Sequence, residues 1–176
     1  MKFSLSVAVG NYDRTRALVD GRVRIDGVNP AFMTLSPEEM FFRAFRHADF
    51  DITELSLASY AVSLANDANE YTALPIFLSR AFRHSSIYVT HESGIQKPEQ
   101  MRGKRIGIAE YQLTANVWAR ALLEDDYGVS PSEIVWVRGG MDAPVRPEKL
   151  RLDLPSDVRV EAVRPGETLN LLLTQG

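Results

Sequence analysis

The sequence contains no cysteine, and this absence removes several kinds of chemistry. Without a thiol, the chain forms no disulfide, binds no zinc through thiolate groups and has no cysteine nucleophile. Histidine, arginine, tyrosine and carboxylate side chains must therefore carry any chemistry.

A strong net charge and long apolar runs are also lacking. The 20 Lys and Arg residues nearly cancel the 23 Asp and Glu residues, which leaves a formal charge of -3. A nucleic-acid-binding domain usually has a basic surface, and a membrane-spanning helix needs about 20 consecutive apolar residues. We therefore expect neither nucleic acid nor a membrane span, and a small molecule or another protein as the partner.

The apolar start of the chain, MKFSLSVAVG, is short, alternates with serine and leads directly into charged residues. A secretory signal has a continuous apolar region followed by a small-residue cleavage site. We interpret this stretch as a strand and expect a cytoplasmic protein.

Motifs for metal or nucleotide binding are missing. The histidines at positions 47, 84 and 91 lack the HExxH spacing, and no carboxylate pattern resembles a calcium loop. Neither a glycine-rich phosphate loop nor a GxSxG elbow occurs. The sequence predicts no metal site and disfavours hydrolases and nucleotide-dependent enzymes.

What is present is enough hydrophobic content, 45% of 176 residues, to form a core. Strand and helix patterns alternate, which indicates an α/β fold. In the first half, strands are predicted at 3–9, 22–25, 31–35, 51–57 and 71–77, and helices at 12–19, 37–49 and 59–66. In the second half, strands are predicted at 85–90, 103–109, 134–137 and 158–163, and helices at 113–127 and 166–175.

Local signals define several of these ends. Ser36 and Glu39 have the spacing of a helix capping box, and Gly128 is expected to end the helix 113–127. Residues 103–137 should form a strand–helix–strand unit, followed by a loop with an edge strand. We assign Trp118 to the core because its spacing from Leu122 is helical.

Polar clusters follow predicted strands, where α/β proteins commonly bind ligands. The first cluster contains Arg14 and Arg16, whose planar guanidinium groups can hold a carboxylate. Each arginine could instead form a surface salt bridge with Asp13 or Asp20. Asn11 and Tyr12 belong to the same cluster.

Other candidates lie further along the chain. His84 could exchange a proton near neutral pH, although a lone histidine is often structural. Glu54 is a candidate acid or base at the end of a predicted strand, close to Ser56. The segment 110–114 can cradle an anion at the start of a helix, although Thr114 could instead cap that helix.

The chain contains four longer blocks of interest, which are GNYDRTRALVDGRV, LSPEEMFFRAFRHADFDITELSLASY, LPIFLSRAFRHSSIYV and GKRIGIAEYQLTANVWARALLEDDYGV. Taken together, these blocks resemble the 4,5-dihydroxyphthalate decarboxylase family. The resemblance extends to WVRGG and to residues 148–155, and it covers nearly the whole chain in one consistent order.

This resemblance implies a fold like that of type II periplasmic-binding proteins, with two lobes of mixed sheet flanked by helices and a ligand between the lobes. Residues 1–90 would form the first lobe, and residues 91–176 would form the hinge and part of the second. Because family members continue beyond the length of this chain, we expect the second lobe to be incomplete.

The resemblance also implies a reaction. Protonation of a ring carbon of 4,5-dihydroxyphthalate would release carbon dioxide and leave protocatechuate, without a cofactor. We hypothesise that His84 or Glu54 transfers the proton. The residues expected to bind this small anionic aromatic substrate are Asn11, Tyr12, Arg14, Arg16, Ser56, Arg80, Tyr111, Gln112 and Thr114.

The alternative function is a non-catalytic solute-binding protein for a small anionic or aromatic ligand, because a fold alone does not settle function. A homo-oligomer, in which partner chains complete the second lobe, is compatible with either function.

Overall fold

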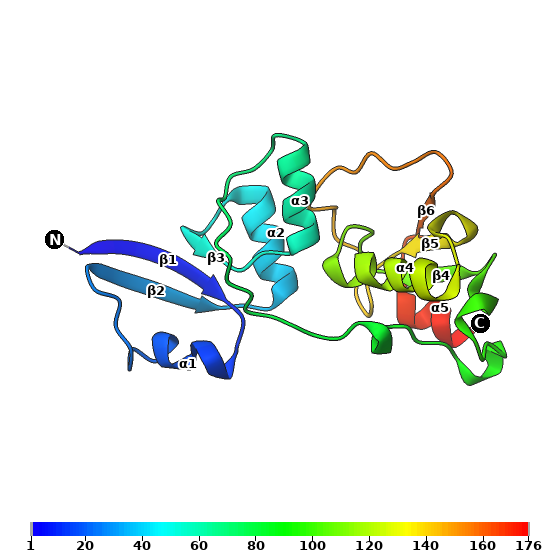
Figure 1. Cartoon of the computed structure of the whole chain (residues 1–176), viewed down its shortest axis with the longest axis horizontal. Coiled ribbons are helices and arrows are strands. Elements are labelled where there is room, and N and C mark those ends of the chain that lie inside the picture. Colours follow the sequence, from blue (N-terminus) through cyan, green and yellow to red (C-terminus); the bar gives the residue numbers. More distant parts are fainter. Residues whose placement is uncertain (1, 176) are drawn as a thin grey trace. The chain divides into compact units, whose positions relative to one another are not determined.

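The computed structural model describes residues 2–175. They form two compact units, one ending at Leu78 and the other beginning at Ser79. Each unit has a small parallel sheet and helices (Figure 1), so the α/β class expected from the sequence is confirmed.

The first unit is built on a sheet with the strand order β2-β1-β3. The central strand β1 (Phe3–Val9) pairs along its whole length with β2 (Val28–Thr34) but at only two positions with β3 (Ile52–Thr53). Beside the short β3, the Asp51 carboxylate accepts hydrogen bonds of 2.7 Å from both the backbone N–H and the hydroxyl of Ser6.

The helices of the first unit are α1 (Asp13–Val19), α2 (Pro37–His47) and α3 (Leu57–Ala65). The predicted cap of α2 is confirmed, because the Ser36 hydroxyl accepts a hydrogen bond from the backbone N–H of Glu39. Strands β1 and β2 point towards α2 and α3 (Figure 1). The buried core consists of Ala8, Met40, Ala44 and Phe50.

The second unit contains the strands β4 (Arg105–Ile108), β5 (Val135–Arg138) and β6 (Arg159–Ala162), which are all parallel and lie in that order. Helix α4 (Thr114–Tyr127) connects β4 to β5, which confirms the predicted strand–helix–strand unit and the edge position of β6.

Turns and packing complete the second unit. Helix α4 ends at Gly128, whose φ of +64° suits a residue without a Cβ atom. Helix α5 (Leu169–Gln175) packs Leu169 onto Gly107 of β4 and onto Gly139, which directly follows β5. Short 3-10 turns lie at His84–Ser86 (η1), His91–Ser93 (η2), Pro98–Met101 (η3) and Pro131–Glu133 (η4).

The strand predictions near β2 and β3 need correction. Residues 22–25 form no strand, and β2 begins at Val28, before the strand predicted at 31–35, and includes Pro30. Proline is compatible with β2 because this strand lies at the sheet edge. The strand predicted at 51–57 has only two residues, because Ser56 already caps α3.

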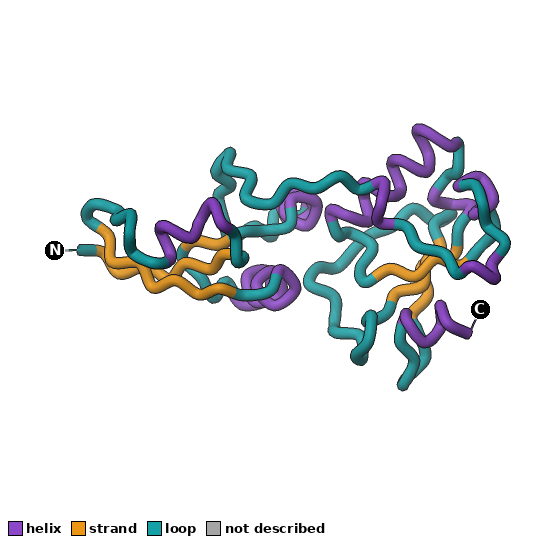
Figure 2. The backbone as a smooth tube through the Cα atoms, turned by 90° about the horizontal axis from the view of Figure 1, so that it is seen from below, coloured by secondary structure: helices purple, strands orange, loops and turns teal. Residues whose placement is uncertain are grey.

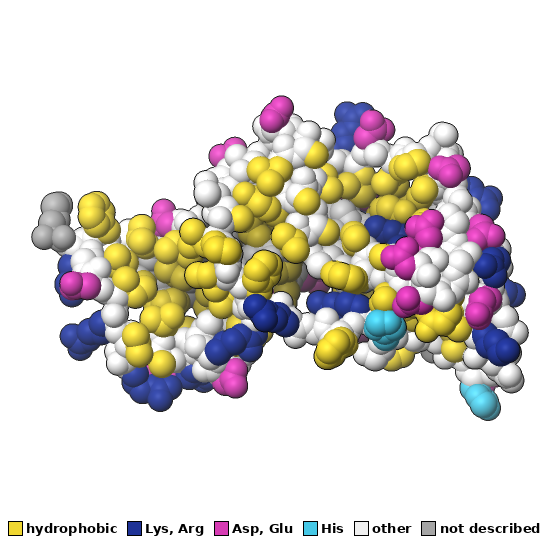
Figure 3. Space-filling model, in the orientation of Figure 1, with side chains coloured by type: hydrophobic (Ala, Val, Ile, Leu, Met, Phe, Trp, Pro, Cys, Tyr) yellow, Lys and Arg dark blue, Asp and Glu magenta, His cyan; other side chains and the backbone are white. Residues whose placement is uncertain are grey.

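The strands predicted at 71–77 and 85–90 are absent from the described chain, where these residues form loops and the turn η1 (Figure 2). An apolar alternating pattern becomes a strand only where a neighbouring strand completes its hydrogen bonds. No such neighbour pairs with them among residues 2–175. Several of their side chains are exposed, including Leu74, Ile76, Phe77, Tyr88 and Val89. Figure 3 shows hydrophobic side chains spread over the face in view.

Trp118 was also wrongly assigned to the core, because its side chain is 55% exposed. The buried residues of α4 are Arg120 and Leu123. No helix within residues 2–175 is long and apolar enough to cross a membrane.

Candidate functional site

Polar residues gather in the first unit where β1 and β3 end. Because the two strands are parallel, Gly10 and Glu54 follow them at the same end of the sheet, where both strands have their C-termini. The Glu54 carboxylate accepts a hydrogen bond of 2.9 Å from the Tyr12 hydroxyl and one of 3.4 Å from the Gly10 backbone N–H. Two predicted site residues, Tyr12 and Glu54, are therefore in direct contact.

Gly10 leaves room for the Tyr12 ring, because it has no Cβ atom. A Cβ atom at position 10 would lie 2.6 Å from the Cζ atom of Tyr12 and 2.8 Å from its hydroxyl oxygen, closer than non-bonded atoms approach. The sequence marks Gly10 only as the end of a strand. No periodic pattern shows that a later ring folds back over it.

The two arginines of the first cluster are exposed, and Arg14 contacts Tyr12. The guanidinium carbon of Arg14 is 4.2 Å from the Tyr12 ring centroid, and one of its nitrogens donates to the carbonyl oxygen of Leu78. Arg14 also lies 3.6 Å from Asp13, so the surface salt bridge considered as an alternative is present. The positive charge of Arg14 thus lies over the face of the Tyr12 ring, whose hydroxyl is hydrogen-bonded to the Glu54 carboxylate.

Asn11 and Ser56 have local partners. The side-chain oxygen of Asn11 accepts a hydrogen bond of 2.5 Å from Arg16, which fixes that guanidinium group beside the start of α1. Ser56 is buried, and its hydroxyl accepts a hydrogen bond of 3.4 Å from the backbone N–H of Ser59. Ser56 therefore caps α3, whatever else it does.

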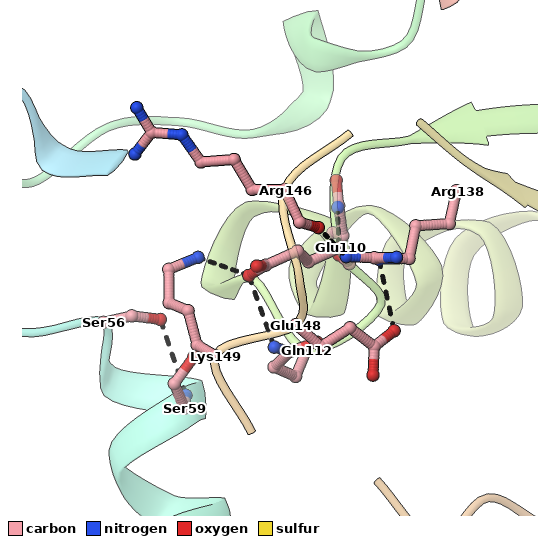
Figure 4. A network of polar contacts seen from close by, with 9 residues as sticks. Ser56, Ser59, Glu110, Gln112, Arg138, Arg146, Glu148 and Lys149 are labelled. Atoms are coloured by element: carbon pink, nitrogen blue, oxygen red, sulfur yellow. Dashed lines mark hydrogen bonds and ion pairs between the residues drawn. The ribbon is translucent and has the colours of Figure 1, made fainter. Parts of the chain in front are cut away.

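A second polar group lies in the second unit, where the loop between β4 and α4 contacts the segment between β5 and β6. The Nε2 atom of Gln112 donates a 3.3 Å hydrogen bond to an oxygen of Glu110, and Lys149 donates to the same oxygen. All three side chains are buried. Figure 4 shows Lys149 and Gln112 pointing towards Glu110 from two different segments.

Tyr111 is held by Arg120. The Arg120 guanidinium carbon is 3.6 Å from the Tyr111 ring centroid, and its Nη1 atom donates a 2.7 Å hydrogen bond to the Tyr111 carbonyl oxygen. Burial raises the pKa of the Tyr111 hydroxyl, although Arg120 acts in the opposite direction. The same burial lowers the pKa of Arg120. Tyr111 also contacts Trp136 edge to face.

Thr114 and Arg80 are the remaining binding candidates. Thr114 is the first residue of α4, and Leu113 occupies the capping position, so Thr114 does not cap this helix as considered from the sequence. Arg80 is exposed in the segment that precedes η1.

His84 lies away from the Gln112 group. Its Nε2 atom is 3.5 Å from a carboxylate oxygen of Asp126, which belongs to the last turn of α4. Gln112 precedes the first turn of this helix, and 14 helical residues extend about 20 Å. His84 instead borders a cavity of about 220 Å³ with the buried residues Met101 and Leu123.

Sequence reasoning missed Lys149 and Arg120 as parts of these groups. Lys149 lies between β5 and β6 in a segment interpreted as a loop, where nothing distinguishes a buried lysine from a solvated one. Arg120 lies three residues before Leu123 on the same face of α4, but only the structure shows that this face is the buried one.

The structure also reports on metal binding. Residues 2–175 contain no group of three or more histidine, aspartate or glutamate side chains placed to hold a metal ion.

Comparisons with known proteins identify relatives. No family model matches the chain. The chain is 57% identical over 175 residues to proteins called 4,5-dihydroxyphthalate decarboxylase from Comamonas testosteroni and Pseudomonas putida. The aligned region covers 99% of this chain, but only 53% of the Comamonas protein and 68% of the Pseudomonas protein. The chain thus spans between half and about two thirds of the length of these relatives, and it belongs to the 4,5-dihydroxyphthalate decarboxylase family.

Proposed function

We propose that the chain holds and decarboxylates 4,5-dihydroxyphthalate, giving protocatechuate and carbon dioxide. The observation that carries this proposal is the 57% identity, over 99% of the chain, to two relatives that bear this name. The polar groups around Glu54 and Gln112 support it, because they offer charges and hydrogen bonds suited to an anionic ring with hydroxyl groups.

The proposed reaction needs one proton and no redox change. A proton adds to the ring carbon that carries the departing carboxylate, and a ring hydroxyl para to that carbon stabilises the resulting cationic character. The bond to the carboxylate carbon then breaks, its electron pair restores the aromatic ring, and carbon dioxide leaves. The protein must supply a proton donor and hold the second carboxylate in place.

Glu54 and His84 are the two proposed proton donors, and their surroundings differ. Glu54 accepts hydrogen bonds from Tyr12 and Gly10, so it must take up a proton before it can donate one. The Nε2 atom of His84 lies 3.5 Å from a carboxylate oxygen of Asp126. Arg14, Arg16 and Arg80 are proposed to hold the remaining carboxylate.

Other proposed binding contacts come from polar side chains of each unit, and those around Gln112 would serve a proton donor other than His84, which lies about 20 Å away at the far end of α4. Asn11, Tyr12 and Ser56 in the first unit, and Tyr111, Gln112 and Thr114 in the second, are proposed to orient the ring.

We extend the proposal to the architecture and setting. Residues 1–90 would form the first lobe of a fold like that of type II periplasmic-binding proteins, and residues 91–176 the hinge and part of the second. The parallel sheet and helices of each unit support two α/β lobes. We also propose a cytoplasmic location and a homo-oligomer, which cell fractionation and sedimentation would test.

The decisive experiment incubates the purified chain with 4,5-dihydroxyphthalate and measures carbon dioxide and protocatechuate, alongside a calorimetric binding titration. Turnover supports the enzyme. Binding without turnover supports the solute-binding alternative and contradicts catalysis by this chain.

Variants would then assign the proton donor. If Glu54 donates, Glu54→Gln abolishes turnover while His84→Asn retains it, and the reverse pattern identifies His84. Glu92→Gln, an exposed carboxylate in η2, serves as the control. Full activity in both variants would remove both residues from the proposed step.

A further inference from the structure

The buried group of Glu110, Gln112 and Lys149 has a property that the proposed roles do not explain. Gln112 is only 3% exposed, and its Oε1 atom has no hydrogen-bond partner among the described residues. A buried acceptor without a donor is unfavourable by about 1–3 kcal/mol, so such atoms are rare in folded proteins.

The neighbours of Gln112 fix which end of its amide remains without a partner. Lys149 donates to the Glu110 oxygen that also receives the Gln112 hydrogen bond, and a carboxylate paired with an ammonium group can only accept. Gln112 must therefore turn its NH₂ group towards Glu110. Its carbonyl oxygen is left as an acceptor facing away from the ion pair.

The turn around Gln112 is also held through its backbone. The carbonyl oxygen of Glu110 accepts a 2.6 Å hydrogen bond from Asn116, and that of Tyr111 accepts one from Arg120. With these contacts and the ion pair in place, the amide of Gln112 has little freedom to rotate. The turn is therefore preorganised around one acceptor atom.

We propose that the Oε1 atom of Gln112 accepts a hydrogen bond from a ring hydroxyl of the substrate, and that Lys149 is a positioning residue that orients this amide through Glu110. The inference rests on the proposed function. It assigns to the Oε1 atom of Gln112 the task of distinguishing a hydroxylated aromatic dicarboxylate from an unhydroxylated one. Because Oε1 is buried, this hydrogen bond to the substrate requires a local opening at Gln112.

The test compares the affinities of 4,5-dihydroxyphthalate and phthalate, which differ only in the two hydroxyl groups. The wild-type chain should bind the hydroxylated compound more tightly. In Gln112→Met, which keeps the length of the side chain and removes the acceptor, the ratio of the two dissociation constants should fall about tenfold. The dissociation constant for phthalate should stay unchanged. Gln96→Met, at an exposed glutamine of the same unit, should keep the wild-type ratio.

A second variant separates orientation from folding. Glu110→Gln combined with Lys149→Met removes both charges, so no unpaired buried charge remains. An amide at position 110 can donate as well as accept, and it no longer dictates which way Gln112 turns. We expect this double variant to fold, as judged by circular dichroism, and to lose most of the hydroxyl preference.

The outcomes separate the inference from the function on which it rests. An unchanged preference in either variant would overturn the inference even if the wild-type chain decarboxylates its substrate. Equal wild-type affinity for the two compounds would do the same. Failure of the wild-type chain to bind either compound would contradict the proposed function and the inference together.

Discussion

Replacing Gly10 by alanine tests how the first polar group is built. The new methyl carbon would lie 2.6 Å from the Tyr12 ring, so the ring must move by about 1 Å to reach an ordinary contact distance. This movement breaks the hydrogen bond of 2.9 Å from Tyr12 to Glu54 and withdraws the ring from Arg14.

The size of the effect follows from these contacts. A hydrogen bond to a charged group contributes about 1.5 kcal/mol at the low end, which suits this half-buried pair. The exposed cation–π contact adds about 0.5 kcal/mol. Alanine lowers the entropy of the unfolded chain and offsets about 0.5 kcal/mol, since Gly10 has no positive φ that alanine would resist. We therefore expect Gly10→Ala to lower the free energy of unfolding by about 1.5 kcal/mol.

A double-mutant cycle shows whether the loss acts through Tyr12. In a Tyr12→Ala background the methyl group meets no ring, and only the entropic term remains. Gly10→Ala should then stabilise the chain by about 0.5 kcal/mol, so its effect changes sign. Urea unfolding followed by circular dichroism measures all four proteins. The same loss of stability in both backgrounds would refute this account of Gly10.

Three further predictions concern other parts of the chain. Hydrogen bonds from the backbone and the hydroxyl of Ser6 lower the pKa of Asp51 below 3.8, so their stabilising effect should be full above that pH and decline as the pH falls through the lowered pKa. In Asp51→Asn, urea unfolding should therefore show a weaker loss of stability below about pH 4 than in the wild-type chain. An equal pH dependence in both proteins would contradict the assignment. Leu169→Ala should lower the free energy of unfolding by about 2 kcal/mol, because Leu169 fills the space over Gly107 and Gly139. The control Leu173→Ala, at an exposed leucine, should change it by less than about 0.5 kcal/mol. Similar losses of stability in both variants, measured by thermal unfolding, would argue against this packing role. Lys149→Met should lower the free energy of unfolding by about 3 kcal/mol, because it leaves the buried Glu110 without its ion-pair partner. Lys104→Met, at an exposed lysine, should leave the free energy of unfolding nearly unchanged. Equal stability of the two variants in urea unfolding would contradict this interpretation.

Local patterns predicted those parts of the fold whose partners are close in sequence. The alternation at 3–9, the Ser36 cap and the stop at Gly128 all gave the correct element. The unit from β4 to β5 was also predicted correctly, because its helix and strands follow one another directly.

Patterns failed where the outcome depends on a distant partner. The segments 71–77 and 85–90 have apolar side chains typical of strands, but no neighbouring strand pairs with them within residues 2–175. Trp118 has the spacing of a core residue, yet nothing in the sequence shows which face of α4 the second unit covers.

The candidate site was predictable in outline only. Parallel strands end at the same edge of a sheet, so the proximity of Tyr12 and Glu54 follows from their places after β1 and β3. The contact between Glu110 and Lys149 joins residues 39 positions apart through a segment without helix or strand. No periodicity encodes a contact of that kind.

The bond between Asp51 and Ser6 bears on how copies of the chain behave in solution. Strand β3 pairs with β1 only at Val7 and Ala8. An unpaired backbone N–H on the rest of this side could bind a strand of another molecule, which would then extend the sheet. The Asp51 carboxylate already occupies the N–H of Ser6 and brings a negative charge to the same place. An incoming strand would have to displace this carboxylate, so the side of β1 that β3 leaves uncovered is less available for strand addition.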